Sequence, residues 1–183
     1  MALTLQDARE LAVQNSPYLT QLLVENPDIA TGALTDVTGE LERIQTSIQG
    51  ENTSDTQELM ELLRGVKRRA HLLIALMDIA RLWDCTQVTR HLTQLADSAL
   101  QTALSFALKE AGFEGDGAGI FVIAVGKYGA FELNYSSDID FMVFYDPDVV
   151  TLPQTRKPHL VLIRLVQKMV KLLDQITHSG YVF

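Results

Sequence analysis

This sequence has a single cysteine, no long apolar run and no start of the kind found in signal peptides. Cys85 is the sole cysteine among 183 residues, so no disulfide can form within the chain, which fits a reducing compartment. No segment approaches the roughly 20 uninterrupted apolar residues that span a bilayer. The first residues also lack the basic and apolar regions of a signal peptide. These absences predict a cytoplasmic protein without membrane contact.

Positive charge is also scarce. The chain has 15 lysines and arginines against 23 aspartates and glutamates, which gives a net charge of −8. Nucleic-acid-binding proteins usually present a basic surface, so the composition predicts no nucleic-acid partner. The four histidines show no metal-ligand spacing with one another or with Cys85, which argues against a zinc site.

Hydrophobic residues recur at helical spacing through residues 1–112. Ser16 and Pro17 predict a helix start, and further helices are expected over residues 34–48, 59–80 and 88–106. Residues 72–83 are apolar on nearly every side and should be buried. The helix expected over residues 59–80 also carries a basic cluster of Arg64, Lys67, Arg68 and Arg69. We expect this cluster to face solvent, and contact with an acidic surface of a partner is the alternative.

The pattern changes at residues 112–119, where four glycines fall within eight residues. Two short apolar runs follow, at residues 120–125 and 141–145, and predict strands. A last amphipathic helix is expected over residues 162–176, closed by Gly180, and residues 181–183 read as the start of a further strand. The chain is therefore predicted to be α+β, with a helical region over 1–112 and part of an α/β domain over 113–183.

The segment between the two apolar runs has the sequence GKYGAFELNYSSDID, from Gly126 to Asp140. Side chains alternate along a strand, so Asp138 and Asp140 would point the same way, about 6.5–7 Å apart. Two neighbouring carboxylates repel each other, and a divalent cation between them relieves that repulsion. Glycine-rich backbone just before them suits a phosphate. The combination indicates metal-assisted phosphoryl or nucleotidyl transfer.

This arrangement resembles the nucleotidyltransferase superfamily typified by DNA polymerase beta, although Lys127 stands where that superfamily usually has a second glycine or a serine. The fifteen residues are more specifically similar to the signature of the glutamine synthetase adenylyltransferase/adenylyl-removing family, and closer to its N-terminal, adenylyl-removing copy. Segments around residues 16–23, 64–82 and 177–183 also resemble that family. The resemblance thus covers nearly the whole chain.

Roles for the motif residues follow from their chemistry. Asp138 and Asp140 would hold Mg²⁺, with Mn²⁺ as the other option. Backbone amides from Gly126 to Gly129 would cradle phosphate. Three side chains are further expected to contact phosphate: Lys127, Ser136 and Ser137. For Lys127, a lysine that only faces solvent is an equal alternative. For the two serines, the alternative is that each hydroxyl caps backbone groups of its own turn. The odd-numbered residues of the second strand should face the core: Ile139, Phe141, Val143 and Tyr145.

The resemblance implies an enzyme that removes AMP from a tyrosine of adenylylated glutamine synthetase by phosphorolysis and yields ADP. It also implies adenine nucleotide, inorganic phosphate and the PII signal protein as partners. The family's third carboxylate lies in a pattern of the type Arg-x-Asp-Leu-Arg, which would follow Phe183. Neither Asp146 nor Asp174 is a plausible substitute, so an incomplete active site and an inactive fragment are expected. Three alternatives stay open: AMP transfer from ATP to a protein, a nucleotide- or glutamine-responsive regulatory module, and a helical interaction domain.

Overall fold

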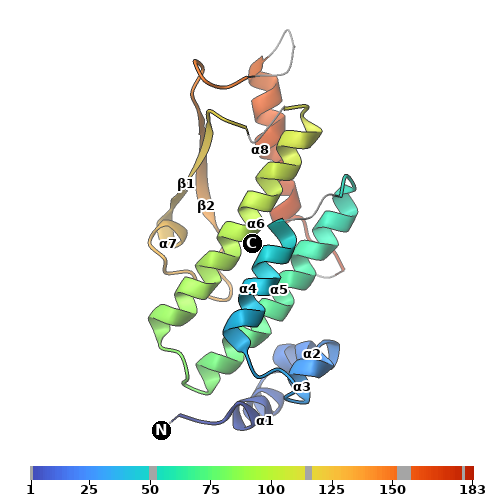
Figure 1. The fold of residues 1–183 in the computed structure, drawn as a ribbon, viewed down its shortest axis with the longest axis vertical. Helices are drawn as coiled ribbons and strands as arrows, with labels where there is room; N and C mark the ends of the chain where they lie inside the picture. Colours follow the sequence, from blue (N-terminus) through green and yellow to red (C-terminus); the bar gives the residue numbers. More distant parts are fainter. Residues whose placement is uncertain (1, 50–52, 114–116, 152–157, 179) are drawn as a thin grey trace.

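A computed structural model describes residues 2–49, 53–113, 117–151, 158–178 and 180–183 (Figure 1). Over these residues the chain is mostly helical with one two-stranded antiparallel sheet. The predicted α+β class is confirmed, and the attribution to the nucleotidyltransferase fold stays a prediction. In the described part of the chain, no helix combines the length and apolar character needed to cross a bilayer. The elements in order are α1 Leu5–Asn15, α2 Pro17–Glu25, α3 Pro27–Ala30, α4 Val37–Gln49, α5 Thr56–Ile79, α6 Cys85–Glu110, β1 Ile120–Val125, α7 Gly126–Gly129, β2 Asp140–Tyr145 and α8 Pro158–Asp174.

Helix starts are set by side chains that cap free backbone amides. Ser16 accepts a hydrogen bond from the amide of Leu19 at the start of α2, and Pro17 occupies the first helical position. Asp84 caps α6 by accepting from the amide of Gln87, whose side chain in turn accepts from the amide of Asp84. These local signals explain why the predicted helices begin within a few residues of their observed starts.

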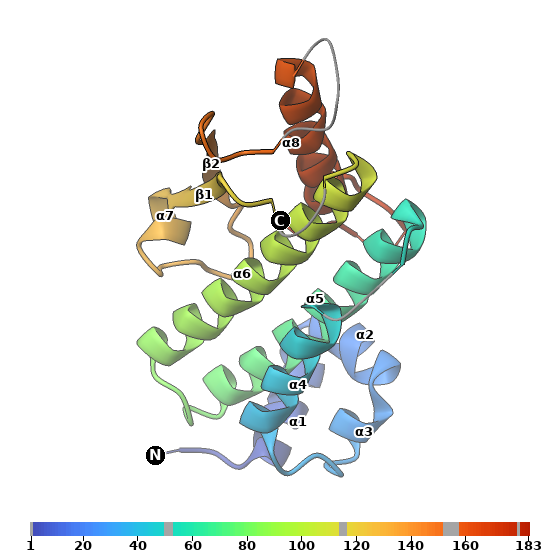
Figure 2. The ribbon, with the colours of Figure 1, turned by 45° about the horizontal axis from the view of Figure 1, so that its top comes forward.

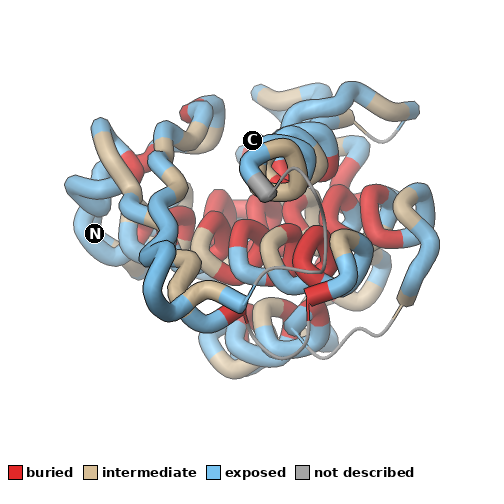
Figure 3. Tube along the Cα trace, turned by 90° about the horizontal axis from the view of Figure 1, so that it is seen from above, coloured by how far each residue is buried: buried red, intermediate tan, exposed pale blue. Residues whose placement is uncertain are grey.

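The two long helices α5 and α6 form the centre of the molecule (Figure 2). The expected burial of residues 72–83 is confirmed for Leu72 through Leu76, each at most 8% exposed, and is wrong for Leu82, which is 45% exposed. Helix α4 packs on both long helices, and α8 packs against the C-terminal half of α6. Buried positions concentrate along these central helices (Figure 3).

The sheet lies on the other side of α6 from α4 and pairs Ile120 with Tyr145 through Val125 with Asp140. The two strands lie at the two predicted apolar runs. However, β2 begins at Asp140, so Asp138 precedes the strand, whereas both aspartates were expected to lie on it. Burial alternates as expected, since one face is half-buried and the other is exposed. Tyr145 is an exception to the prediction: at the strand end it is 49% exposed instead of core.

The end of the chain differs from the prediction. Helix α8 ends at Asp174, so Gly180 does not close it. Gly180 lies six residues later, with φ of +92°, and forms a single β-bridge with Thr177. Residues 181–183 form no strand, because the amide of Val182 donates to the carbonyl of Leu173 at 2.9 Å and turns the chain back onto α8. The two regions expected from the sequence, residues 1–112 and 113–183, contribute to one hydrophobic core. Residues 114–116, at the expected boundary, lie outside the described residues.

The expectation of a solvated face for the basic cluster is wrong. Arg64 is fully buried and its guanidinium donates to backbone carbonyls, including that of Gly180 at 2.9 Å. Arg69 forms ion pairs of 2.6 Å with Asp28 and with Glu40, and these partners raise the pKa of the guanidinium. The helix therefore turns this face towards α2, α3, α4 and the C-terminal segment, where acidic side chains and carbonyls replace water.

Candidate active site

The glycine turn after β1 holds a carboxylate against its backbone. Gly126 has φ of +59°, and a Cβ on it would lie 2.9 Å from Oδ2 of Asp140. A Cβ on Gly129 would lie 2.5 Å from the carbonyl oxygen of Ala124, so α7 packs closely onto the strand that precedes it. Both glycines are required by this geometry. The structure thus brings together the glycine turn and the second aspartate of the motif.

Tyr128 fixes the turn to the helical core. It is 3% exposed, and its hydroxyl donates a hydrogen bond of 2.6 Å to Oδ1 of Asp97 on α6. Burial, followed by the hydrogen bond and charge of Asp97, raises the pKa of the phenol. The sequence offered one sign of this anchor, an aromatic residue inside a glycine turn, and no sign of its partner 31 positions away.

A tight turn at residues 134–137 leads to the aspartates. The amide of Ser136 donates to the side-chain oxygen of Asn134 at 3.0 Å, and the amide of Asn134 donates to the hydroxyl of Ser137 at 3.0 Å. Ser137 is buried, so its hydroxyl serves the turn, whereas Ser136 is exposed. The turn-capping alternative is therefore what the structure displays for Ser137.

Tyr135 ties this turn to α5. Its hydroxyl donates to Oδ2 of Asp78 at 3.1 Å, and its ring meets His71 edge-on at 5.8 Å between centroids. Burial, then the charge of Asp78, raises the pKa of Tyr135. Burial and the nearby Lys67 charge lower the pKa of His71 to about 3, so this imidazole is neutral at pH 7. Sequence reasoning missed these contacts, which link residues far apart in the chain.

Three charged side chains of the motif are exposed to solvent: Lys127, Asp138 and Asp140. Among the described residues, no group of three or more histidine, cysteine, aspartate or glutamate side chains is placed to hold a metal. Mg²⁺ commonly binds through one or two carboxylates and completes its shell with water and substrate phosphate. The exposed carboxylate of Asp140 beside the glycine turn, with that of Asp138 two residues earlier in the chain, fits that requirement.

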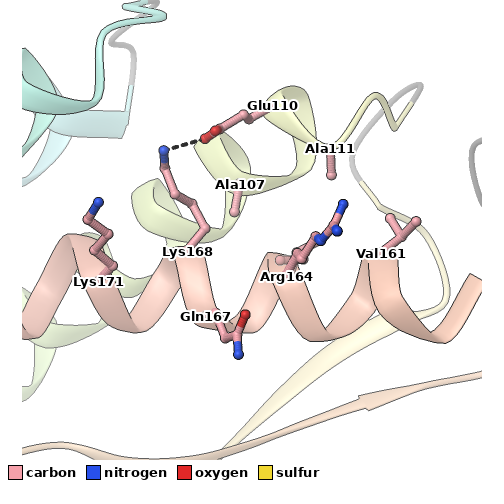
Figure 4. A pocket seen from close by; sticks show the side chains of 9 residues that line it. Ala107, Glu110, Ala111, Val161, Arg164, Gln167, Lys168 and Lys171 are labelled. Carbon is pink, nitrogen blue, oxygen red and sulfur yellow. Dashed lines mark ion pairs between the residues drawn. The ribbon is translucent and has the colours of Figure 1, made fainter.

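A separate cavity of about 440 Å³ lies between α6 and α8, away from the motif (Figure 4). Its floor is apolar, and Arg164 and Lys171 line it. Lys168 on the same helix reaches across to Glu110 of α6, with an ion pair of 2.6 Å. None of the motif residues lines this cavity, so it is no part of the candidate active site.

The glutamate–ammonia ligase adenylyltransferase family matches residues 6–183, which includes the whole motif. The chain belongs to this family. A bifunctional glutamine synthetase adenylyltransferase/adenylyl-removing enzyme of Bradyrhizobium diazoefficiens is 44% identical over 70% of this chain and 14% of its own length. Enzymes of the same name from Rhodopseudomonas palustris and Caulobacter vibrioides are both 39% identical, over 92% and 70% of this chain and over 18% and 14% of their own lengths.

The chain therefore spans less than a fifth of each of these three relatives. Family membership is thus shown for the chain, while the activity, substrates and partners of a whole enzyme are matters of proposal.

Proposed function

We propose that the chain supplies the first part of an adenylyl-removing domain, which transfers the AMP group of an adenylylated tyrosine of glutamine synthetase to inorganic phosphate and so forms ADP. The observation that carries this proposal is the contact between the Asp140 carboxylate and the Gly126 turn, within a motif that the family match covers. In the proposed reaction an oxygen of inorganic phosphate bonds to the adenylyl phosphorus. The bond between that phosphorus and the tyrosine oxygen breaks, the tyrosine regains a proton, and ADP leaves.

Asp138 and Asp140 are the residues that would hold Mg²⁺, or Mn²⁺, in this site. A bound divalent ion would neutralise charge on the phosphate oxygens in the transition state. The chain's own contribution is positional, because Tyr128 and Tyr135 anchor the glycine turn and the serine turn, which both precede the carboxylates in the chain. Exposed Lys127 would offset phosphate charge at the mouth of the site.

The third carboxylate of the family pattern would come from residues beyond Phe183. Glutamine synthetase, adenine nucleotide and phosphate are the proposed partners, with the PII signal protein acting on the whole enzyme in the cytoplasm. The relatives are named for two activities, adenylyl transfer and adenylyl removal. Transfer of AMP from ATP is therefore the second candidate, and its product is pyrophosphate instead of ADP.

The test is ADP release from adenylylated glutamine synthetase, with phosphate and Mg²⁺, by this chain extended through the next strand of the family pattern. Phosphate-dependent release that Asp138→Asn abolishes, and that the exposed control Asp148→Asn leaves intact, would support the proposal. Pyrophosphate release from ATP would favour the transfer reaction. A folded, extended protein that yields neither product would refute both, and equal activity in Asp138→Asn would refute the metal role.

A further inference from the structure

A second pocket lies next to the motif without containing its aspartates. It has a volume of about 350 Å³ and opens between α2, α5, the 134–137 turn and the C-terminal segment. The residues that matter for its chemistry are Tyr18, Lys67, Arg68, Tyr135, Ser136 and Tyr181. Neither Asp138 nor Asp140 is among its lining residues, so it is distinct from the proposed metal site.

Lys67 places a buried positive charge at this pocket. Its side chain lies on α5 and the residue is 8% exposed. The ammonium donates to the carbonyl of Tyr181 at 3.3 Å and lies 4.3 Å from the centre of the Tyr181 ring. Over the described residues, no carboxylate forms an ion pair with Lys67 or with its buried neighbour Arg64. A buried charge without a counter-charge is costly, and burial together with Arg64 lowers the pKa of Lys67 to about 8.

The other lining groups add donors and little negative charge. Arg68 lies at the pocket and is paired with Glu25 on α2. His71 is neutral at pH 7 and contributes no charge. Ser136 and Tyr18 bring hydroxyl groups from two further elements. An ammonium has three N–H donors, and one of them is used by the Tyr181 carbonyl.

We propose that this pocket binds the phosphate group of a small phosphorylated molecule, with Lys67 as its charge partner. Donors reach the pocket from three separate elements, α2, α5 and the 134–137 turn. A tetrahedral anion with several acceptor oxygens can meet all of them, whereas a carboxylate has two oxygens on one edge. The volume exceeds that of a lone phosphate, and the tyrosine rings offer faces for an attached organic group. Ser136 belongs to the catalytic motif as well, and Lys67, which lies outside that motif, is the residue that distinguishes this pocket from the proposed catalytic site.

The experiment titrates the 183-residue chain with inorganic phosphate and, separately, with AMP, and follows binding by calorimetry and by ¹⁵N–¹H NMR. Acetate at matched ionic strength is the control anion. Phosphate should shift the amides of Tyr135, Ser136, Gly180 and Tyr181. The substitution Lys67→Met should weaken binding by about 10- to 100-fold, as expected for the loss of a charge-assisted hydrogen bond. Lys171→Met makes the same change in net charge on an exposed lysine of α8 and should leave binding unchanged.

Each other result has a definite meaning. Binding of AMP alone, with the same dependence on Lys67, supports the site and identifies its ligand as a phosphate monoester. Equal binding by Lys67→Met, an equal loss in Lys171→Met, or equal binding of acetate would overturn it. Amide shifts centred on residues 126–129 would place phosphate at the glycine turn and would also overturn it. If Lys67→Met does not fold, Tyr18→Phe removes a lining hydroxyl outside the motif and provides the same test, with an expected weakening of about 3- to 10-fold.

Discussion

Replacing Lys67 with methionine should stabilise the chain in the absence of ligand, although the substitution removes a hydrogen bond. The lowering of the Lys67 pKa from 10.5 to about 8 corresponds to about 3 kcal/mol, at about 1.4 kcal/mol for each pH unit. Methionine keeps the apolar stem that packs in the core and removes the buried charge. It also leaves the Tyr181 carbonyl without its donor, which costs about 1 kcal/mol.

The expected net gain in the free energy of unfolding at pH 7 is therefore about 2 kcal/mol, or about 4–8 °C in Tm for a chain of this size. Urea denaturation at a series of pH values, in buffer without phosphate, measures it. Lys171→Met, on the exposed face of α8, should change stability by less than about 0.5 kcal/mol.

The pH dependence gives the sharper test. Below about pH 8 the lysine is protonated in both the folded and the unfolded chain, so the full penalty is present and the gain from Lys67→Met is constant. Between about pH 8 and pH 10.5 the unfolded state binds more protons than the folded state, so the stability of the original chain rises with pH relative to the variant. Groups common to both chains cancel in the difference.

A difference that is independent of pH from 7 to 10.5, or a loss of more than about 1 kcal/mol in Lys67→Met, would refute the assignment of Lys67 as an uncompensated buried charge. Phosphate should reduce this difference in stability, since it would stabilise the original chain through the pocket more than it stabilises the variant. Identical responses of the two chains to phosphate would contradict the pocket proposal while leaving the pH argument intact.

Two further substitutions test the geometry of the glycine turn by urea denaturation. Gly126→Ala should lower the free energy of unfolding by about 1–3 kcal/mol, because a Cβ would strain a left-handed residue and press on Asp140. The matched change Gly65→Ala, where a Cβ meets nothing within 4 Å, should stabilise α5 by about 0.5–1 kcal/mol, and similar effects at the two sites would contradict the close contact. Tyr128→Phe removes the hydrogen bond to Asp97 and should cost about 1–2 kcal/mol; a change below about 0.5 kcal/mol would show that this bond does not hold the turn.

Much of the secondary structure was predictable because its signals are local. The 3.6-residue repeat of apolar positions in α5 and α6 is a property of neighbouring residues, and so are the caps at Ser16 and Asp84. The two apolar runs identified the strands, and the glycine turn between them was expected to adopt a conformation suited to phosphate. The prediction at Gly180 is wrong: a glycine after a helical pattern predicts the end of the helix there, but α8 ends at Asp174.

Burial of charge was not predictable in this way. Arg64 and Lys67 read as part of a solvated cluster because four basic residues in six positions usually face water. Their partners include backbone carbonyls of α8 and of the C-terminal segment, which are more than 100 residues away in the sequence. A pattern confined to one helix contains no information about which segment covers it.

The α+β class, the long helices, the two strands and the motif from Gly126 to Asp140 could all be identified in the amino-acid sequence, since each depends on the spacing of nearby side chains. Three contacts depend on tertiary packing instead: Tyr128 bonds to Asp97, Asp140 lies against Gly126, and the ammonium of Lys67 lies under the ring of Tyr181. Those contacts join residues separated by 14 to 114 positions, and they form only when packing of the hydrophobic core brings distant segments together.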